Sequence, residues 1–292
     1  MGEIVTQKRA LLIGINYLKS KSSRLFGCIN DVVNMRTMLM SRFGYTSYDI
    51  ITLRDDVKSR MPTRSNIMSG LNRIAEISTP TSETLIHYSG HGAFVRDRNG
   101  DEPDCLDEVI IPVDSEIITD DVLFSIISRI KGKVLLFFDS CHSGSVCDLQ
   151  YSQEYNNGTF IKRVNNKKYI SNPNIIMMSG CKDNQTSADT YNFDTWQPIG
   201  AFTDNLVSVL SSSDEPIDMV DVYRSVCDRI SLSGYTQIPV FSSSMEQQQY
   251  LYSSSGRKPS FNAAALKPIQ KSMLMSNNKI IKSSFVSIID AR

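Results

Sequence analysis

The sequence predicts an α/β fold, a mostly parallel sheet with helices on both faces, from two observations. Short apolar, β-prone runs alternate along the chain with segments of helical periodicity. The runs are almost continuously hydrophobic, which is typical of parallel strands that are buried on both faces. We therefore expect one sheet of about six or more strands. The candidate strands are 10–15, 50–54, 84–89, 133–138, 174–179 and 238–241.

Helical patterns lie between these runs, at 28–43, 64–77, 120–130, 201–210 and 217–231. Thr63, which follows Pro62, is the predicted N-cap of the second helix. The polar stretch 149–173 is predicted to be an exposed loop. Residues 253–292 are Ser-rich and basic, with an apolar patch that is a candidate edge strand. We predict one domain, 1–252, followed by a C-terminal tail, 253–292.

Composition excludes several classes of function. The hydrophobic fraction of 41% and charged fraction of 21% are those of an ordinary soluble protein. No apolar run approaches the roughly 18 to 20 residues that span a membrane. The first ten residues lack the apolar core of a signal peptide, so we expect the cytosol. The six cysteines show no C-x-x-C spacing, which favours free thiols: they are residues 28, 105, 141, 147, 181 and 227.

Charge is unevenly distributed along the chain. The net charge is zero, but residues 256–292 carry seven Lys or Arg and one acid. The rest of the chain is therefore about six charges negative, which argues against nucleic acid as a partner. The basic tail is expected to be solvated.

Two of the apolar runs end in reactive side chains. The run 84–89 leads into Gly90-His91-Gly92, and the run 133–138 leads into Asp139-Ser140-Cys141. Ligands bind at the carboxyl ends of strands in open α/β sheets. An imidazole at one strand end and a thiol at another are the groups that nucleophilic catalysis by cysteine requires. Glycine beside His91 lets a substrate approach, and the Gly92 and Cys141 amides could bind an oxyanion.

The histidines and cysteines of these motifs have other interpretations. A buried structural cysteine and a core histidine are the simplest alternative. His87 and His142 are rivals for the role of base. His87 and His91 have the spacing of a helical zinc pair, but the β-prone run and Gly90 argue against a helix. Zinc held by Cys141, His142 and Cys147 lacks an apparent fourth ligand.

Acidic residues lie near the nucleophile and in one loop. Asp139 precedes Cys141 by two residues, and Asp31 opens a predicted helix. Two carboxylates in a pocket would favour a cationic side chain, although Asp31 could equally cap its helix. Ten acids lie between 97 and 121. Such a loop could supply the six to eight oxygen ligands of Ca²⁺ or be a solvated surface, but it is not an EF-hand because the required Gly is missing.

These motifs, taken together, resemble one family. His91 and Cys141 are 50 positions apart, the spacing of the caspase pair. The chain resembles type I-like metacaspases, caspase-clan cysteine peptidases, over about residues 8–245. We expect no long N-terminal extension of the kind that type I members usually carry. The matching segments are Ala10 to Tyr17, Gly27-Cys28-Ile29-Asn30-Asp31, His87 to Gly92, Asp139 to Gly144 and Ser179 to Asp189.

The resemblance implies a caspase-like fold and a role for each motif. Cys141 would be the nucleophile that forms a thioester, and His91 the general base or ion-pair partner. The implied pocket for the residue before the scissile bond consists of Cys28, Asp31, Ser89 and Asp139, which predicts Arg or Lys rather than Asp. The implied calcium ligands are Asp107, Asp120, Asp121 and Asp148. Calcium would then be an activator by conformational selection, outside the chemical step.

The resemblance also bears on processing and partners. The substrates would be proteins or peptides, the enzyme would act as a monomer, and self-cleavage would fall in the basic stretch at Lys162, Arg163, Lys167 or Lys168. A solvated basic loop is an equal interpretation of that stretch. Two alternatives to the whole function remain: a catalytically silent caspase-like scaffold, and a calcium-independent, paracaspase-like peptidase.

Overall fold

The structure is a computed structural model of the 292-residue chain. It describes residues 6–97, 100, 105–141, 143–144, 146–156, 158–165, 169–181, 189–191, 197–213, 216–246 and 249–252.

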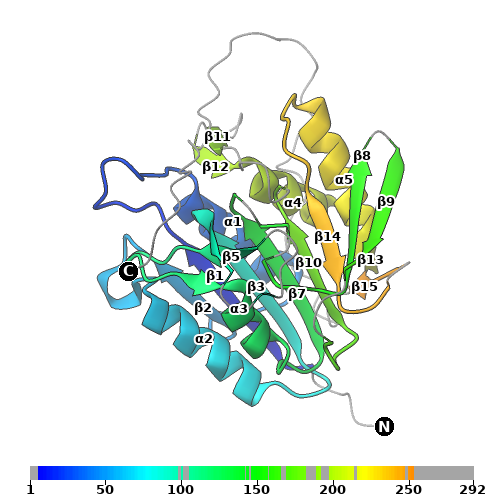
Figure 1. Cartoon of the computed structure of the whole chain (residues 1–292), viewed down its shortest axis with the longest axis horizontal. Coiled ribbons are helices and arrows are strands. Elements are labelled where there is room, and N and C mark those ends of the chain that lie inside the picture. Colours follow the sequence, from blue (N-terminus) through cyan, green and yellow to red (C-terminus); the bar gives the residue numbers. More distant parts are fainter. Residues whose placement is uncertain are drawn as a thin grey trace.

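The fold is built on a sheet of eight strands in the order β2-β1-β3-β7-β10-β14-β8-β9 (Figure 1). The first five strands pair in parallel, and the last three join antiparallel. The parallel strands are β1 (Lys8–Gly14), β2 (Ile50–Arg54), β3 (Glu83–Ser89), β7 (Lys133–Asp139) and β10 (Ile175–Ser179). The antiparallel strands are β8 (Tyr151–Asn156), β9 (Thr159–Val164) and β14 (Val240–Ser243).

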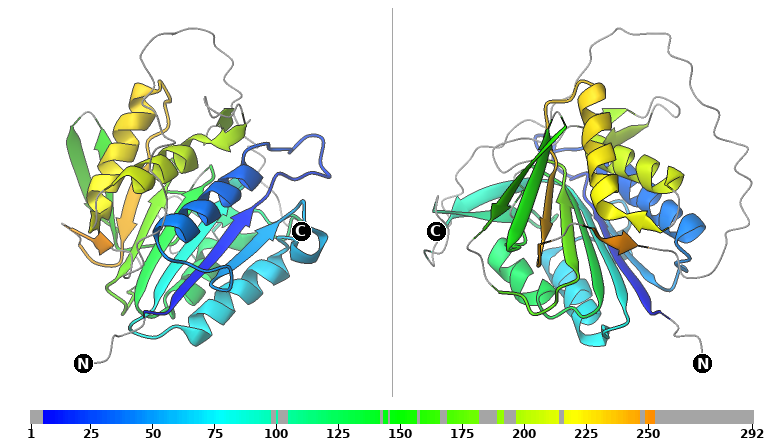
Figure 2. Two further views of the ribbon diagram at one scale, coloured as in Figure 1. Left: turned by 180° about the vertical axis from the view of Figure 1, so that it is seen from behind. Right: turned by 90° about the vertical axis from the view of Figure 1, so that its right-hand side faces the viewer.

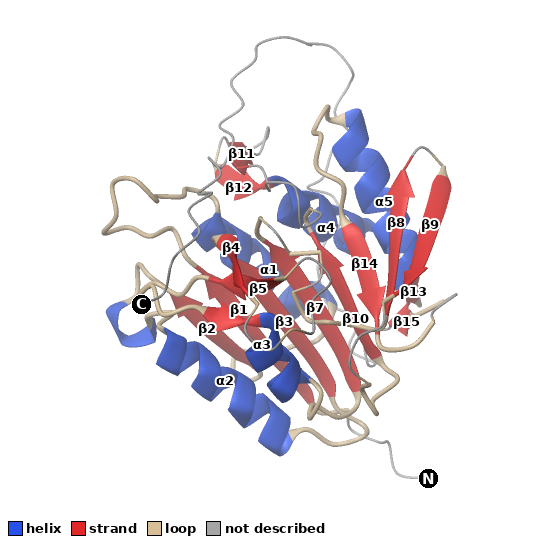
Figure 3. Cartoon of the chain, in the orientation of Figure 1, coloured by secondary structure: helices blue, strands red, loops and turns tan. Residues whose placement is uncertain are grey.

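Helices cover both faces of this sheet, as Figures 2 and 3 show. Because successive side chains of a strand point to opposite faces, Leu85 of β3 joins one core and Ile86 joins the other. One core lies under α1 (Cys28–Arg42), α4 (Ala201–Ser212) and α5 (Met219–Leu232). The other lies under α2 (Arg64–Ile77) and α3 (Asp120–Ile127). The 3₁₀ helix η1 (Lys58–Arg60) precedes α2.

Short strands extend beyond the ends of the main sheet. A three-stranded sheet directly follows β3 and contains β4 (Gly92–Arg96), β5 (Leu106–Ile110) and β6 (Ile118–Thr119). Two small pairs are formed by β11 (Asp189–Tyr191) with β12 (Pro198–Gly200), and by β13 (Ile217–Asp218) with β15 (Leu251–Tyr252). The first pair leads directly into α4, and β13 leads directly into α5.

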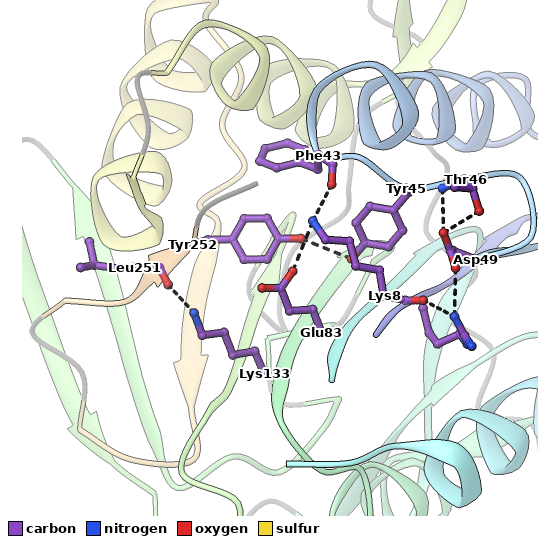
Figure 4. A network of polar contacts seen from close by, with 10 residues as sticks. Lys8, Phe43, Tyr45, Thr46, Asp49, Glu83, Lys133, Leu251 and Tyr252 are labelled. Atoms are coloured by element: carbon purple, nitrogen blue, oxygen red, sulfur yellow. Dashed lines mark hydrogen bonds and ion pairs between the residues drawn. The ribbon is translucent and has the colours of Figure 1, made fainter. Parts of the chain in front are cut away.

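A buried network ties β15 to the amino ends of the parallel strands (Figure 4). The Lys8 ammonium lies 3.5 Å from the Glu83 carboxylate, and both side chains are buried. The ammonium also donates to the Phe43 carbonyl and lies over the Tyr45 ring. The Tyr45 and Tyr252 hydroxyls are 3.3 Å apart. The amino end of the sheet is therefore held by an internal ion pair, far along the strands from their carboxyl ends.

The predicted α/β class, with a mostly parallel sheet and helices on both faces, is confirmed. All six predicted strands are present within a few residues of their expected bounds. Thr63 is the N-cap of α2, where its hydroxyl accepts from the Asn66 amide. The helix expected at 217–231 starts later, because 217–218 form β13 and Asp218 caps α5.

The predicted exposed loop at 149–173 is wrong in its first half, where β8 and β9 form a hairpin on the edge of the main sheet. The Tyr155 and Phe160 rings contact each other in a tilted arrangement, with centroids 4.8 Å apart. Both rings pack against the core under α5, which holds the hairpin in place. Lys162 and Arg163 lie on β9. Lys167, Lys168 and the tail 253–292 lie outside the described residues, so the domain boundary stays a prediction. No helix in the described part of the chain has the length and apolar character to cross a membrane.

Candidate active site

The carboxyl ends of β3 and β7 bring the predicted dyad together. The two strands are parallel neighbours in a register that pairs Ser89 with Asp139, so the residues that follow each strand emerge side by side. A Cβ on Gly92 would lie only 2.1 Å from the Cys141 carbonyl oxygen. The His91-Gly92 segment therefore lies directly against the Cys141 backbone. A side chain larger than glycine's hydrogen has no room there, which explains the glycine at position 92.

The His91 ring is held by two partners from the loop after β1. Its Nε2 is 2.8 Å from the Ser23 carbonyl oxygen, and its ring centroid is 4.6 Å from that of Tyr17. A carbonyl can only accept, so Nε2 carries the proton. In the neutral ring the other nitrogen, Nδ1, is then the basic atom. The Cys141 thiol is 5% exposed.

Tyr17 is held in an unusual backbone conformation beside this ring. Its φ is 51°, in the left-handed region that residues other than glycine rarely adopt. Its hydroxyl accepts from the His91 amide at 2.9 Å and donates to the Ile111 carbonyl at 2.6 Å. Burial, together with the neighbouring Tyr88, raises the pKa of Tyr17 well above its usual value. The hydroxyl therefore stays protonated and fixes the backbone at His91.

The predicted pocket acids converge beneath α1 and α4. Asp31 accepts from the Ser89 hydroxyl at 2.7 Å and from the Gly200 amide at 2.8 Å. Asp139 accepts through Oδ2 from the Thr203 amide at 3.0 Å and the Thr203 hydroxyl at 2.9 Å. Both acids are fully buried. A Cβ on Gly200 would lie 2.1 Å from Asp139 Oδ2 and 2.8 Å from Asp31 Oδ2, so one glycine touches both carboxylates.

The structure excludes the helix-cap interpretation of Asp31. Gly27 is the N-cap of α1, and no side chain caps it. Asp31 instead accepts from donors on β3 and at the start of α4. Cys28, the first residue of α1, is also buried. Three of the four predicted pocket residues therefore lie together: Ser89 donates to Asp31, and the Asp31 and Asp139 carboxylates both lie against Gly200.

His87 is distinct from the dyad. Its buried side chain lies on the α4 face of β3, with Nε2 3.1 Å from the Thr203 hydroxyl. It reaches Asp139 through this hydroxyl. Sequence reasoning identified neither Thr203 nor Gly200, because no local motif marks them and the contacts exist only in the folded chain. His142 lies outside the described residues.

A second group of acids is buried beside the α2/α3 core, so these residues are not a solvated surface. Asp107, Asp120 and Asp148 are each less than a tenth exposed, whereas Asp121 is half-buried. Burial, and then repulsion by Asp148 and Asp107, raises the pKa of Asp120 to about 7. The Asp120 carboxylate accepts from the Asp121 amide at 2.7 Å and the Glu108 amide at 3.3 Å.

This acidic cluster is linked to the nucleophile through the chain. Asp148 has a φ of 48°, a strained value for a non-glycine residue, and follows Cys141 by seven positions. Burial, and then the charges of Asp148 and Asp120, raises the pKa of the Cys147 thiol well above its usual value. Among the described residues, no three His, Cys, Asp or Glu side chains are already arranged around one metal position. Carboxylates that repel one another are nevertheless the donors that a hard cation requires.

All six cysteines are free thiols, as the sequence predicts. Only Cys105 among them is exposed. The other five, Cys141 and Cys147 among them, are buried.

Comparison with known proteins shows which sequences this chain resembles. Residues 8–150 match the family model for the metacaspase, peptidase C14 domain. The chain is 33% identical to metacaspase-1 of Kluyveromyces lactis over 82% of its own length and 66% of that protein's. It is 32% identical to metacaspase-1 of Candida glabrata over 83% of its length and 74% of that protein's. The chain thus spans about two thirds of the length of these relatives.

Solved structures show the same fold. A Geobacter sulfurreducens protein superposes with a TM-score of 0.59 at 22% identity, covering 83% of this chain and 95% of its own. Caspase-1 of Spodoptera frugiperda superposes with a TM-score of 0.55 at 13% identity, covering 88% and 92%. The expected caspase-like fold is confirmed. By its sequence relatives, the chain belongs to the metacaspases, a family of cysteine-type endopeptidases in the peptidase C14 group.

Proposed function

We propose that this chain is a calcium-activated cysteine endopeptidase that cleaves after Arg or Lys. The observation that carries the proposal is the contact of the His91-Gly92 segment with the Cys141 backbone, directly beside two buried aspartates. A nucleophile, a base and a pocket for a cation thus share one strand-end cluster. The protonated His91 Nε2 at Ser23 supports the role of its other nitrogen as the base.

The chemistry follows from these atoms. The Cys141 thiol loses its proton to His91, and the sulfur forms a bond to the scissile carbonyl carbon. The oxyanion that results would accept from the amides of Gly92 and Cys141. The carbon–nitrogen bond then breaks as His91 returns the proton to the leaving amine. Water attacks the thioester, the new acid leaves, and the thiol is restored.

The pocket acids would select a cationic side chain. Neutral donors on Ser89, Gly200 and Thr203 hold the Asp31 and Asp139 carboxylates in place. A guanidinium or ammonium that enters the pocket forms charge-assisted bonds with fixed partners, which costs less entropy than ordering mobile ones. An acidic side chain is repelled instead. Cys28 would complete the wall of this pocket.

Calcium would bind at the acidic cluster. Asp107, Asp120 and Asp148, with Asp121 beside them, supply the hard oxygen ligands that Ca²⁺ prefers. When bound, the ion neutralises the repulsion that raises the pKa of Asp120. Because Asp148 lies in the segment that follows Cys141, binding there would favour one conformation of that segment. The ion takes no part in the bond changes.

The monomeric state and the self-cleavage sites are also proposals. The edge strand β9 carries Lys162 and Arg163, whose side chains are 49% and 59% exposed. Charges on an edge strand oppose pairing with a second copy, which supports a monomer. Cleavage at Lys162 or Arg163 would require β9 to separate from β8, whereas Lys167 and Lys168 follow the strand. The free thiols support a reducing compartment such as the cytosol.

The test uses the purified chain, its Cys141→Ala variant and a Cys105→Ser control. Fluorogenic peptides ending in Arg, Lys or Asp are incubated with each protein across a calcium titration. We expect cleavage after Arg and Lys only, dependent on calcium, abolished in Cys141→Ala and unchanged in the control, because Cys105 is exposed.

Each part of the proposal has its own contrary outcome. Cleavage after Asp contradicts the acidic pocket. Activity that survives a chelator contradicts the calcium site and supports a paracaspase-like peptidase. A folded protein that cleaves no peptide with or without calcium supports a catalytically silent scaffold.

A further inference from the structure

A chain of hydrogen bonds runs from His87 to the acidic pocket. His87 lies on β3, four positions before the catalytic His91, and its side chain is fully buried. Its Nε2 is 3.1 Å from the Thr203 hydroxyl, and that hydroxyl is 2.9 Å from Asp139 Oδ2. The Thr203 amide donates to the same oxygen at 3.0 Å. The imidazole thus reaches the pocket acid through one threonine.

The protons in this chain have a fixed direction. The Thr203 hydroxyl carries one proton, and a carboxylate only accepts, so the hydroxyl donates to Asp139. The same oxygen must then accept from His87, and Nε2 of the ring therefore carries a proton. Two donors on Oδ2 fix the plane of the Asp139 carboxylate, and with it the direction of Oδ1.

We propose that His87 and Thr203 are positioning residues for substrate specificity, which hold the Asp139 carboxylate in the orientation that meets the cation of the residue before the scissile bond. The inference rests on the proposed preference for Arg or Lys. Neither residue touches the reacting bond, since both act through Asp139. His87 is therefore not a second base. It is the buried end of a chain of hydrogen bonds that orients the pocket acid Asp139.

The hydrogen bonds of Thr203, in the first turn of α4, reach Asp139 and not Asp31. Residues 200–203 approach both pocket acids, but Asp31 is reached by the Gly200 amide and the Ser89 hydroxyl instead. Asp31 keeps these donors when the Thr203 hydroxyl is removed. A change at Thr203 or His87 should therefore weaken one carboxylate of the pocket and leave the other in place.

The test compares two peptides that differ only in charge. Arginine before the scissile bond carries a guanidinium, whereas citrulline carries a neutral urea of nearly the same shape. We measure kcat and KM for both peptides with Thr203→Val, which removes the hydroxyl and keeps the amide. His87→Leu removes the donor ring, and Thr203→Ser and His87→Gln are the matched variants that retain a hydroxyl and a donor.

We expect Thr203→Val to lose roughly 10- to 100-fold of the preference for arginine over citrulline, mostly through KM, because a hydrogen bond to a charged group is lost. His87→Leu should lose less, roughly 2- to 10-fold, because it removes a donor to the neutral Thr203 hydroxyl. Cleavage of the citrulline peptide and alkylation of Cys141 by iodoacetamide should stay within about twofold of the wild type. Thr203→Ser and His87→Gln should keep most of the preference. If Thr203→Val does not fold, Thr203→Ala takes its place.

The same comparison is made without turnover, by fluorescence polarisation of both peptides on the Cys141→Ala background. Equal losses for the two peptides would mean a structural role and would overturn the inference. An unchanged preference in Thr203→Val and His87→Leu would overturn it as well, while the proposed specificity would stand. A wild-type protein that does not distinguish the two peptides in either assay overturns the proposed specificity itself.

Discussion

The acidic pocket and the acidic cluster both bury aspartates, but their charges meet different surroundings. In the pocket, Asp31 and Asp139 accept from four neutral hydroxyl and amide donors, two of them on Thr203 of α4. In the cluster, burial, and then the charges of Asp148 and Asp107, raises the pKa of Asp120 to about 7. The pocket lies on the α1/α4 face of the sheet, whereas the cluster lies beside Cys147 of the α2/α3 core.

This difference in surroundings explains how buried aspartates can have different roles in the pocket and in the cluster. Fixed neutral donors keep a carboxylate ready for a cation that arrives with each substrate and leaves again. Carboxylates that repel one another are stable together only when a proton or a metal ion neutralises them. A third case lies at the amino end of the sheet, where Glu83 meets the internal cation of Lys8 (Figure 4). The three sites thus differ in the source of the positive charge.

The largest effect is expected where the cation is internal. Lys8→Met leaves the Glu83 carboxylate buried without its ammonium, and we expect the free energy of unfolding to fall by about 3–5 kcal/mol. Urea denaturation monitored by circular dichroism measures this. The double variant with Glu83→Leu should recover most of the loss, because the unpaired charge is gone. A loss below about 1 kcal/mol for Lys8→Met would show that the pair is solvated.

A smaller effect is expected in the pocket, on catalysis. Asp139→Asn removes one charge but keeps an oxygen that can accept from Thr203. We expect kcat/KM for an arginine peptide to fall about 100-fold, since a charge-assisted bond worth roughly 2–3 kcal/mol is lost. Cleavage of a citrulline peptide should change little. The exposed Asp114→Asn is the control. Equal losses for both peptides would contradict a charge role for Asp139.

In the cluster, the expected effect depends on pH. The unfolded chain loses the Asp120 proton near pH 4, whereas the folded chain keeps it until about pH 7. Unfolding therefore releases a proton between these values, and the free energy of unfolding falls as the pH rises from about 4 to 7. Asp120→Asn cannot ionise, so in EDTA at pH 8 we expect it to be at least about 1 kcal/mol more stable than the wild type.

Calcium adds a second difference between the wild type and Asp120→Asn. At pH 8 the ion should raise the Tm of the wild type by binding its ionised cluster, and raise that of Asp120→Asn much less. Thermal unfolding at pH 5 and 8, with EDTA or calcium, gives both differences. An Asp120→Asn protein that is less stable than the wild type in EDTA at pH 8 would contradict the repulsion. The same calcium shift in both proteins would place the ion elsewhere.

The sequence predicts the parts of this molecule that depend on local pattern. The runs 84–89 and 133–138 correspond to β3 and β7 within one residue, because buried parallel strands are almost wholly apolar. The edge hairpin was missed, because half-exposed strands such as β9 carry charged residues and their packing partner is the distant α5. Edge strands lack the continuous apolar signal of central ones.

The residues that hold the site residues in place come together only in the folded chain, so they are harder to predict from the sequence. Asp139 and Thr203 are 64 positions apart, and no motif around Thr203 marks it as a donor to the pocket. Similarly, the sequence presents His87 as a rival base or as half of a zinc pair, because its sequence neighbourhood is that of His91. The sequence identifies residues that carry the chemistry, whereas the residues that hold them come from other elements and are found only in the fold.

The smallest effect is expected at the dyad. Tyr17→Phe keeps the ring that stacks on His91 but removes the hydroxyl that accepts from the His91 amide. The bond to the Ile111 carbonyl is lost with it, but only the bond from the amide positions His91. That bond is worth about 1 kcal/mol, so kcat should fall roughly fivefold. The preference for arginine over citrulline should not change, because Tyr17 does not contact the pocket acids through any bond described above. Tyr48→Phe, at a side chain that is 95% exposed, is the control. Steady-state kinetics on both peptides separates the outcomes: a changed preference would show that dyad and pocket are coupled, whereas a lower kcat alone would show that the fold supports them independently.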